Sequence, residues 1–163
     1  MISLIVAAAA NMAIGRKGGI PWHISEDFKY FKSVTLGHTV IMGYGTWASM
    51  GCKPLPGRRN IVLTSRWEAM SADGAEFLPG IDAALEATRG EDEVFFIGGG
   101  TVYRQALPYA DKVYLTEIHT IIEDADTFFP SLDPTSWQLV SRSGIKTDEK
   151  SGLSFEFVVY ERR

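Results

Sequence analysis

Short, continuous apolar runs are the feature that most restricts how this chain can fold. Ile2–Ala9 is the longest, and Glu93–Ile97 contains another. A strand covered by protein on both faces has this pattern, whereas a strand with one solvated face alternates apolar and polar residues. Stretches with a helical pattern, Ser25–Leu36 and Ile81–Thr88, lie between the runs, so strands and helices alternate along the chain. Such alternation is typical of an α/β fold with a parallel sheet.

The C-terminal part of the chain has the other pattern. Trp137–Arg142 and Leu153–Glu161 alternate apolar and polar residues and are joined through Lys150-Ser151-Gly152, which predicts an antiparallel hairpin at a sheet edge. Further strands are expected at His38–Met42, Asn60–Thr64, Ala75–Leu78 and Lys112–Ile118, and further helices at Tyr44–Met50 and after the glycines up to Leu107. Because there is no repeat or linker, residues 1–163 are expected to form a single α/β domain. Its central, mainly parallel eight-stranded sheet would end in the antiparallel C-terminal hairpin and be flanked by about four helices.

Composition and charge exclude several functional classes. The 163 residues carry a formal net charge of −4 with no long run of one sign, so no general attraction to nucleic acid or to an anionic membrane is expected. Cys52 is the only cysteine, which excludes an intrachain disulfide and a cysteine-based zinc site. The three histidines, His23, His38 and His119, show no metal-ligand spacing, and no metal is expected.

The first ten residues, MISLIVAAAA, resemble a signal peptide at first sight. They lack a basic segment, the apolar run is too short to span a bilayer, and Asn11 interrupts it. We therefore interpret this segment as a buried strand and expect a cytoplasmic protein. No apolar helix face is left without a place in the predicted core, so a monomer is the expected state.

One carboxylate stands where an apolar residue would be expected. A long loop, Ala10–Ile24, precedes a helix that should begin with Ser25 as its N-cap. On that helix, one side carries the apolar residues that should face the core, and Asp27 lies within it one turn before Phe31. The positive end of the helix dipole would favour an acid in the first turn without any function. A carboxylate in a ligand-binding cleft is the alternative.

Glycines follow two of the predicted strands. Gly43–Ala48, GYGTWA, comes after the HTVIM strand, opens a helix and fits the dinucleotide fingerprint, although a turn that needs glycine explains it equally well. About twenty residues further on, the next strand ends in Thr64-Ser65-Arg66, where an arginine beside two hydroxyl groups suits the 2′-phosphate of NADP rather than the free ribose of NAD.

The second glycine segment is Ile97–Tyr103, IGGGTVY. Backbone without side chains there would let a pyrophosphate approach, and tight helix–strand packing is an equally good explanation. Two such segments on neighbouring strands strengthen the case for one extended phosphate-containing ligand. Arg58-Arg59, which follows a Pro-Gly turn, is either a solvated loop tip or a fork for a carboxylate.

These motifs, taken together and in order, resemble the dihydrofolate reductase family over essentially the whole chain. The most specific match is Ala13-Ile14-Gly15, Ile20-Pro21-Trp22, Asp27, Phe31 and Thr35 at the spacing of the family signature. The other matching segments are Met42-Gly43, Thr46-Trp47, Leu55-Pro56-Gly57-Arg58, Ile97-Gly98-Gly99-Gly100 with Tyr103, Tyr114-Leu115-Thr116 and the C-terminal Tyr160-Glu161-Arg162-Arg163.

The resemblance implies an activity and a role for each matching residue. Members of the family reduce 7,8-dihydrofolate to 5,6,7,8-tetrahydrofolate with NADPH, in support of one-carbon and thymidylate metabolism, and bind antifolate inhibitors. The match makes Asp27, Trp22, Thr116 and Tyr103 the expected catalytic residues. The expected substrate-binding residues are Ile5, Val6, Ala7, Phe28, Phe31, Met50, Leu55, Arg58 and Ile97. Of these, Arg58 would bind the glutamate α-carboxylate. The expected cofactor-binding residues are Ala7, Ile14, Gly15, Ile20, Gly43, Tyr44, Gly45, Thr46, Leu63, Thr64, Ser65, Arg66, Gly98, Gly99, Gly100, Thr101, Val102 and Tyr103. Residues 15–20 belong to a loop that in the family closes over the nicotinamide.

The chain also departs from the family pattern. Tyr44 and Thr101 stand where many relatives have basic residues on the phosphate side of the cofactor, which leaves Arg66 as the main candidate for the 2′-phosphate. Two alternative functions are also compatible with the sequence. A fold-related pyrimidine reductase would not need Asp27, Trp22 and Arg58 together, and a binding module would hold folate or nucleotide without turnover.

Overall fold

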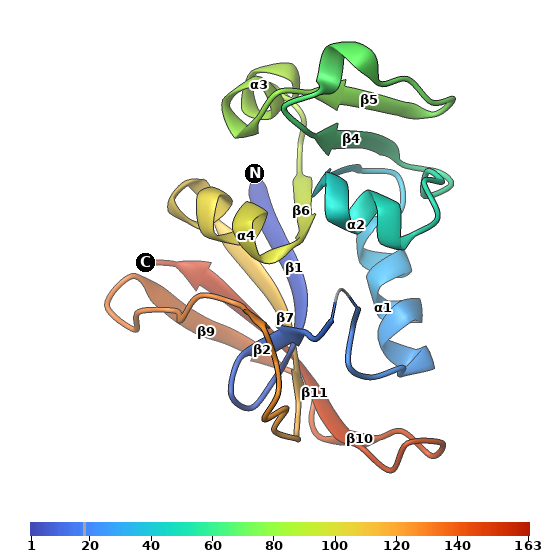
Figure 1. The fold of residues 1–163 in the computed structure, drawn as a ribbon. Coiled ribbons are helices and arrows are strands. Elements are labelled where there is room, and N and C mark those ends of the chain that lie inside the picture. The colour runs from blue at the N-terminus through green and yellow to red at the C-terminus, as the bar shows by residue number, and fades with distance from the viewer. Residues whose placement is uncertain (18) are drawn as a thin grey trace.

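A single mixed sheet forms the centre of the domain in the computed structural model, which describes residues 1–17 and 19–163 (Figure 1). The strand order is β10-β11-β7-β1-β6-β3-β4-β5, and β9 also pairs with β11. The parallel strands are β1 (Ile2–Ala9), β3 (Thr39–Gly43), β4 (Arg59–Leu63), β5 (Ala75–Leu78), β6 (Val94–Gly98) and β7 (Lys112–Ile118). The first strand therefore lies in the middle of the sheet, with β6 on one side and β7 on the other.

The antiparallel end of the sheet differs in detail from the predicted hairpin. β11 (Ser154–Arg162) runs antiparallel to β7, and its other edge is shared by β9 (Trp137–Arg142) and the short β10 (Lys146–Thr147). The sheet thus has nine strands, and β9 and β10 share the position beside β11. The tight turn joins β10, not β9, to β11. That turn is held by Asp148, whose carboxylate accepts hydrogen bonds from the Ser151 backbone and hydroxyl at 2.9 and 2.6 Å.

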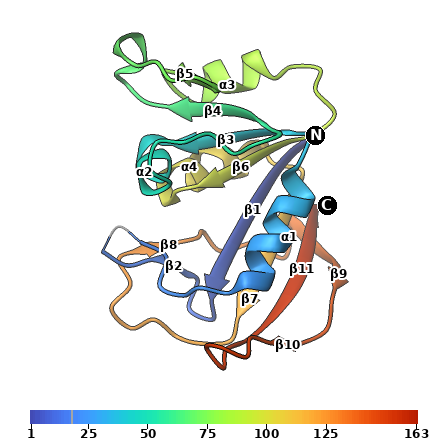
Figure 2. The same cartoon turned by 90° about the vertical axis from the view of Figure 1, so that its right-hand side faces the viewer.

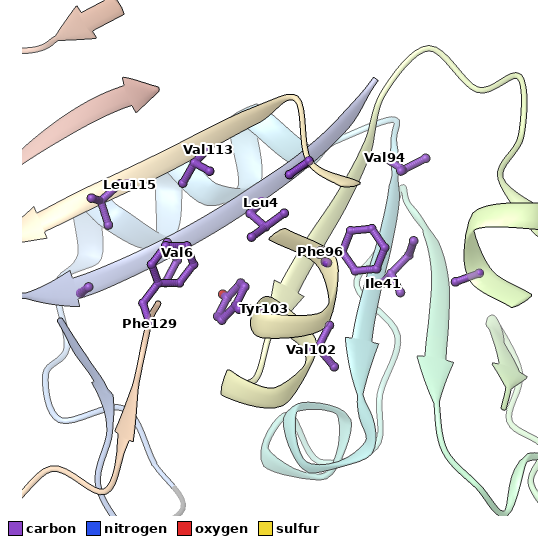
Figure 3. Close-up of a cluster of buried hydrophobic side chains, with 14 of the residues drawn as sticks. Leu4, Val6, Ile41, Val94, Phe96, Val102, Tyr103, Val113, Leu115 and Phe129 are labelled. Carbon is purple, nitrogen blue, oxygen red and sulfur yellow. The ribbon is translucent and has the colours of Figure 1, made fainter. Parts of the chain in front are cut away.

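Helices cover both faces of the sheet (Figure 2). They are α1 (Ser25–Thr35), α2 (Tyr44–Ser49), α3 (Ile81–Ala87) and α4 (Gly100–Ala106), with 3-10 turns at Trp67–Ala69 and Leu107–Tyr109. Alternate residues of β1 enter two different cores, because successive side chains of a strand point to opposite faces. Leu4 and Val6 pack with α4, as Figure 3 shows, whereas Ile5 joins the cluster on the α1 and α2 side. This two-sided burial explains the continuous apolar run and confirms the predicted α/β fold.

Helix α1 departs from the sequence prediction at its start and on its apolar side. Ile24 is the N-cap, Ser25 already belongs to the helix, and no side chain caps it. The side with Ile24, Phe28, Phe31 and Val34 was expected to face the core, but Phe28 is 48% exposed, and Thr35 is the buried residue within the helix. The reason is that α1 borders an open cavity: Phe28 and Phe31 line that cavity.

The long loop before α1 contains a strand that the sequence did not predict. β2 (Ala13–Gly15) pairs antiparallel with β8 (Thr127–Phe128), and Arg16 forms a salt bridge of 3.2 Å to Asp124. Gly18, in the segment that the resemblance describes as a closing loop, lies outside the described residues. No helix in the described ranges is long and apolar enough to cross a membrane.

Candidate active site

A cavity of about 1700 Å³ opens at the carboxyl ends of the parallel strands, where ligands bind in folds of this type. Its wall includes Ala7 near the end of β1, Gly43 at the end of β3, Leu63 at the end of β4, Gly98 at the end of β6 and Thr116 on β7. Single drug-sized ligands occupy pockets of about 300–1,000 Å³. The cavity therefore has room for two ligands side by side.

The structure brings nearly all of the predicted site residues together in this cavity. Each expected catalytic, substrate-binding and cofactor-binding residue lines it, with Arg66 as the exception. Arg66 is exposed and directly follows Thr64 and Ser65, which do line the wall. The individual roles of the lining residues stay predictions.

Asp27 reaches the cavity from the first turn of α1 and meets β7 there. The Thr116 hydroxyl, which is buried, donates a hydrogen bond of 2.7 Å to Asp27 Oδ1. Asp27 Oδ2 has no hydrogen-bond partner within the described part of the chain, so it is free to accept from a ligand. Burial raises the pKa of the Asp27 carboxyl, and the hydrogen bond from Thr116 offsets part of the rise. Because the helix dipole alone requires neither a position facing a cavity nor this partner, the geometry favours the ligand-binding explanation of Asp27.

Tyr103 fixes a backbone carbonyl at the cavity wall. Its hydroxyl donates a hydrogen bond of 2.8 Å to the carbonyl oxygen of Ile5, and both groups are buried. Burial raises the pKa of the Tyr103 phenol, and the charge of Asp27 raises it further, so Tyr103 stays a neutral donor. Trp22 also lines the cavity and packs against the apolar cluster that contains Ile24 and Phe155.

At the other end of the cavity, the guanidinium of Arg58 is held by two contacts. Nε donates to the carbonyl of Pro56 at 2.9 Å, and Nη1 donates to the Thr35 hydroxyl at 3.1 Å. Burial lowers the pKa of Arg58, but arginine keeps its charge in proteins. The remaining N–H groups of an oriented guanidinium suit a carboxylate ligand in a fork geometry.

Asn60, which the sequence interpretation took only as a strand residue, fixes the loop that carries Arg58. Its buried side-chain amide donates to the carbonyls of Leu55 and Arg58 at 3.0 and 2.9 Å, and its oxygen accepts from the Leu55 backbone at 2.9 Å. Lys32 and Lys53 also line the cavity and were missed. An isolated lysine on a helix or loop is ordinarily solvated, so nothing in the sequence marked these two.

The glycines at the strand ends combine close packing with open space. A Cβ at Gly100 would lie 2.7 Å from Thr127 Cγ2, which the packing does not allow without a shift, and one at Gly43 would lie 3.1 Å from Val102 Cγ2, which is a tight contact. A Cβ at Gly45 would meet nothing within 4 Å, and one at Gly99 would meet only the Thr46 hydroxyl, at 3.7 Å. Both Gly45 and Gly99 line the cavity, where bare backbone leaves room for a phosphate group.

A parallel sheet with glycines at two strand ends and an acid facing the same cavity is the arrangement expected of an α/β protein that binds a nucleotide beside a second ligand. Comparison with known proteins agrees with this class of protein. The sequence matches the dihydrofolate reductase family over residues 1–162, and the chain belongs to that family. It is 45% identical over 161 residues to a dihydrofolate reductase from Neisseria meningitidis serogroup A, across 99% of this chain and 98% of the relative.

Two further relatives extend the comparison. The chain is 41% identical to the dihydrofolate reductase of Bacillus subtilis over 163 residues, which cover 100% of this chain and 95% of the relative. A solved structure of dihydrofolate reductase from Enterococcus faecalis, complexed with NADP(H) and RAB-propyl, superposes with a TM-score of 0.90 at 35% identity, over 100% of this chain and 96% of that one. The family resemblance noted from the sequence is thereby confirmed.

Proposed function

We propose that this chain reduces 7,8-dihydrofolate to 5,6,7,8-tetrahydrofolate with NADPH, and so supplies one-carbon and thymidylate metabolism. The observation that carries the proposal is the partly buried Asp27–Thr116 pair, which faces the same cavity as the glycine strand ends. The pair offers a site for a cationic, hydrogen-bonding heterocycle, and the glycines offer one for a nucleotide. Family membership supports both assignments.

The cofactor fits the residues that would hold it. Gly45 and Gly99 leave space at the cavity wall, and Thr46, Thr64 and Ser65 add hydroxyl donors beside them. When bound, NADPH supplies the hydride that is added to pterin C6. Arg66 is the exposed cation nearest in sequence to these hydroxyl groups, and we assign it to the 2′-phosphate.

Asp27 binds the substrate and promotes its protonation. With Thr116 on one oxygen, the carboxylate holds the pterin through its 2-amino group and N3, and a negative charge at that point raises the basicity of the ring. The proton reaches N5 through water that Trp22 helps to position, and the C6–N5 double bond becomes single as C6 gains hydride and N5 gains the proton. Asp27 acts as an electrostatic group, and the proton donor is water.

The remaining residues orient the substrate. Phe28, Phe31, Met50 and Leu55 enclose its rings, and Arg58 binds the α-carboxylate of its glutamate. Tyr103 holds the Ile5 carbonyl in place at the junction between the two ligands. Antifolates that present a protonated diamino ring would compete for Asp27 in the same cavity.

One assay separates this function from the two rivals. Loss of the absorbance of reduced nicotinamide with dihydrofolate and NADPH present identifies the reductase. A binding module would retain folate without consuming NADPH, and a pyrimidine reductase would oxidise NADPH only with an aminopyrimidine substrate. Failure to turn over dihydrofolate under conditions in which both ligands bind would refute the proposal.

A further inference from the structure

Two glutamates and a histidine meet on the sheet away from the cavity. Glu117 and Glu156 are directly paired across the antiparallel strands β7 and β11, and His119 lies two residues beyond Glu117. Residues two apart on extended backbone share a face, and the backbone of His119 continues the ladder by donating to the carbonyl of Ser154 at 2.8 Å. Potential ligand atoms of these three side chains lie within 4.8 Å of one another. None of the three residues lines the cavity.

This arrangement would be unfavourable without a cation. Like charges directly opposite each other on paired strands destabilise a sheet. The Glu156 side chain is also only 10% exposed, so its charge has lost most of its water. Its Oε2 is fixed by the backbone N–H of Gly144 at 3.0 Å, which leaves Oε1 directed at the shared position.

Arg142 supplies a positive charge between Glu117 and Glu156, but another cation could replace its guanidinium. A single nitrogen, Nη1, donates to both Glu156 Oε1 and Glu117 Oε1, at 2.8 and 3.1 Å. The Arg142 side chain is 47% exposed, so its guanidinium can move into water, and a cation that takes its place would neutralise the Glu156 carboxylate. The carboxylates would stay where the sheet register holds them.

We propose that Glu117, His119 and Glu156 bind a divalent transition-metal ion of the Zn²⁺ class, in exchange for Arg142. Two carboxylate oxygens and one imidazole nitrogen match the ligand types of zinc, with water completing the coordination. The nitrogen ligand favours Zn²⁺ and its neighbours over Mg²⁺ and Ca²⁺, which prefer oxygen alone. Spacing along the sequence could not reveal the site, because Glu156 joins the other two residues only through the sheet.

Calorimetric titration of the untagged protein with Zn²⁺ tests the proposal. The wild type should bind one ion, and His119→Gln should weaken it by at least about tenfold, since even outer partners of metal ligands are worth that much. His23→Gln is the matched control, because His23 is also exposed and lies outside both the cluster and the cavity lining. It should leave the dissociation constant unchanged.

Arg142→Gln probes the exchange. Removal of the competing cation should tighten Zn²⁺ binding, while circular dichroism verifies that the variant is folded. An unchanged dissociation constant in His119→Gln, an equal loss in His23→Gln, or weaker binding in folded Arg142→Gln would each overturn the proposal. These readouts do not involve dihydrofolate, so they are independent of the proposed reductase activity.

Discussion

Replacement of Asp27 by asparagine should affect catalysis and stability in opposite directions. The substitution keeps the shape of the side chain and an acceptor for the Thr116 hydroxyl, but it removes the charge that the proposed mechanism needs. A hydrogen bond to a charged group contributes about 1.5–3 kcal/mol, which is roughly a tenfold to hundredfold effect for one such contact. Because the charge also promotes protonation of the substrate, kcat/KM at neutral pH should fall by on the order of 10² or more.

The stability effect follows from the raised pKa of Asp27. Since burial favours the neutral form, the folded protein binds a proton at pH values where the unfolded chain has released it. The free energy of unfolding therefore decreases as pH rises from the ordinary aspartate pKa of 3.8 through the raised folded value. Asparagine cannot ionise, so Asp27→Asn should be more stable than the wild type at neutral pH, and this advantage should disappear in acid below 3.8.

Two measurements examine the reasoning. Steady-state kinetics across pH should show partial recovery of the variant in acid, where the substrate can arrive already protonated. Urea unfolding of both proteins without ligands, at neutral and acidic pH, should show the gain in stability and its loss. A variant that retains near wild-type kcat/KM at neutral pH would refute the assigned role, and one less stable than wild type at neutral pH would refute the account of the buried charge.

Four further substitutions address the Arg58 region and the proposed cofactor region. Arg58→Leu should weaken dihydrofolate binding about tenfold or more while scarcely affecting a pterin without the glutamate tail, and equal losses in KM for both would indicate a structural role. Asn60→Ala removes three hydrogen bonds that hold the Arg58 loop. At about 1 kcal/mol each, it should cost about 3 kcal/mol in urea unfolding and raise KM for dihydrofolate, with the Kd of NADPH unchanged as the internal control. Arg66→Ala should bring the Kd values of NADPH and NADH together, whereas Tyr44→Arg should separate them by a further tenfold or so, and an intact ratio in Arg66→Ala would mean that another cation binds the phosphate.

The sequence was sufficient to predict an element of the fold where its residue pattern has only one physical cause. The run Ile2–Ala9 predicted β1 with its exact bounds, because only a strand buried on both faces combines that length and polarity. The residue pattern around Asp27 left two explanations open, the helix dipole and a ligand-binding cleft, and the family motif favoured the cleft. The actual partner of Asp27, Thr116, came from the family motif, because the two residues meet only when β7 lies beside β1.

Other parts of the structure depend on contacts that leave no local pattern. β2 and β8 are three and two residues long, too short for any periodicity to be visible. The start of α1 was misplaced by one residue, because Ser25 is acceptable both as a cap and within the first turn. Asn60 belongs to an apolar strand in the sequence, and its function as a support for Arg58 appears only when the loop folds back over it.

The central position of β1 sets the timing of folding during protein synthesis. β1 emerges first from the ribosome, but its neighbours β6 and β7 begin only at Val94 and Lys112. At synthesis rates of about 5–20 residues per second, the apolar first strand waits on the order of 5–20 s before either neighbour exists. Both edges of β1 stay unpaired for that interval, so chaperone demand should be greatest before β6 and β7 have left the exit tunnel and should fall afterwards.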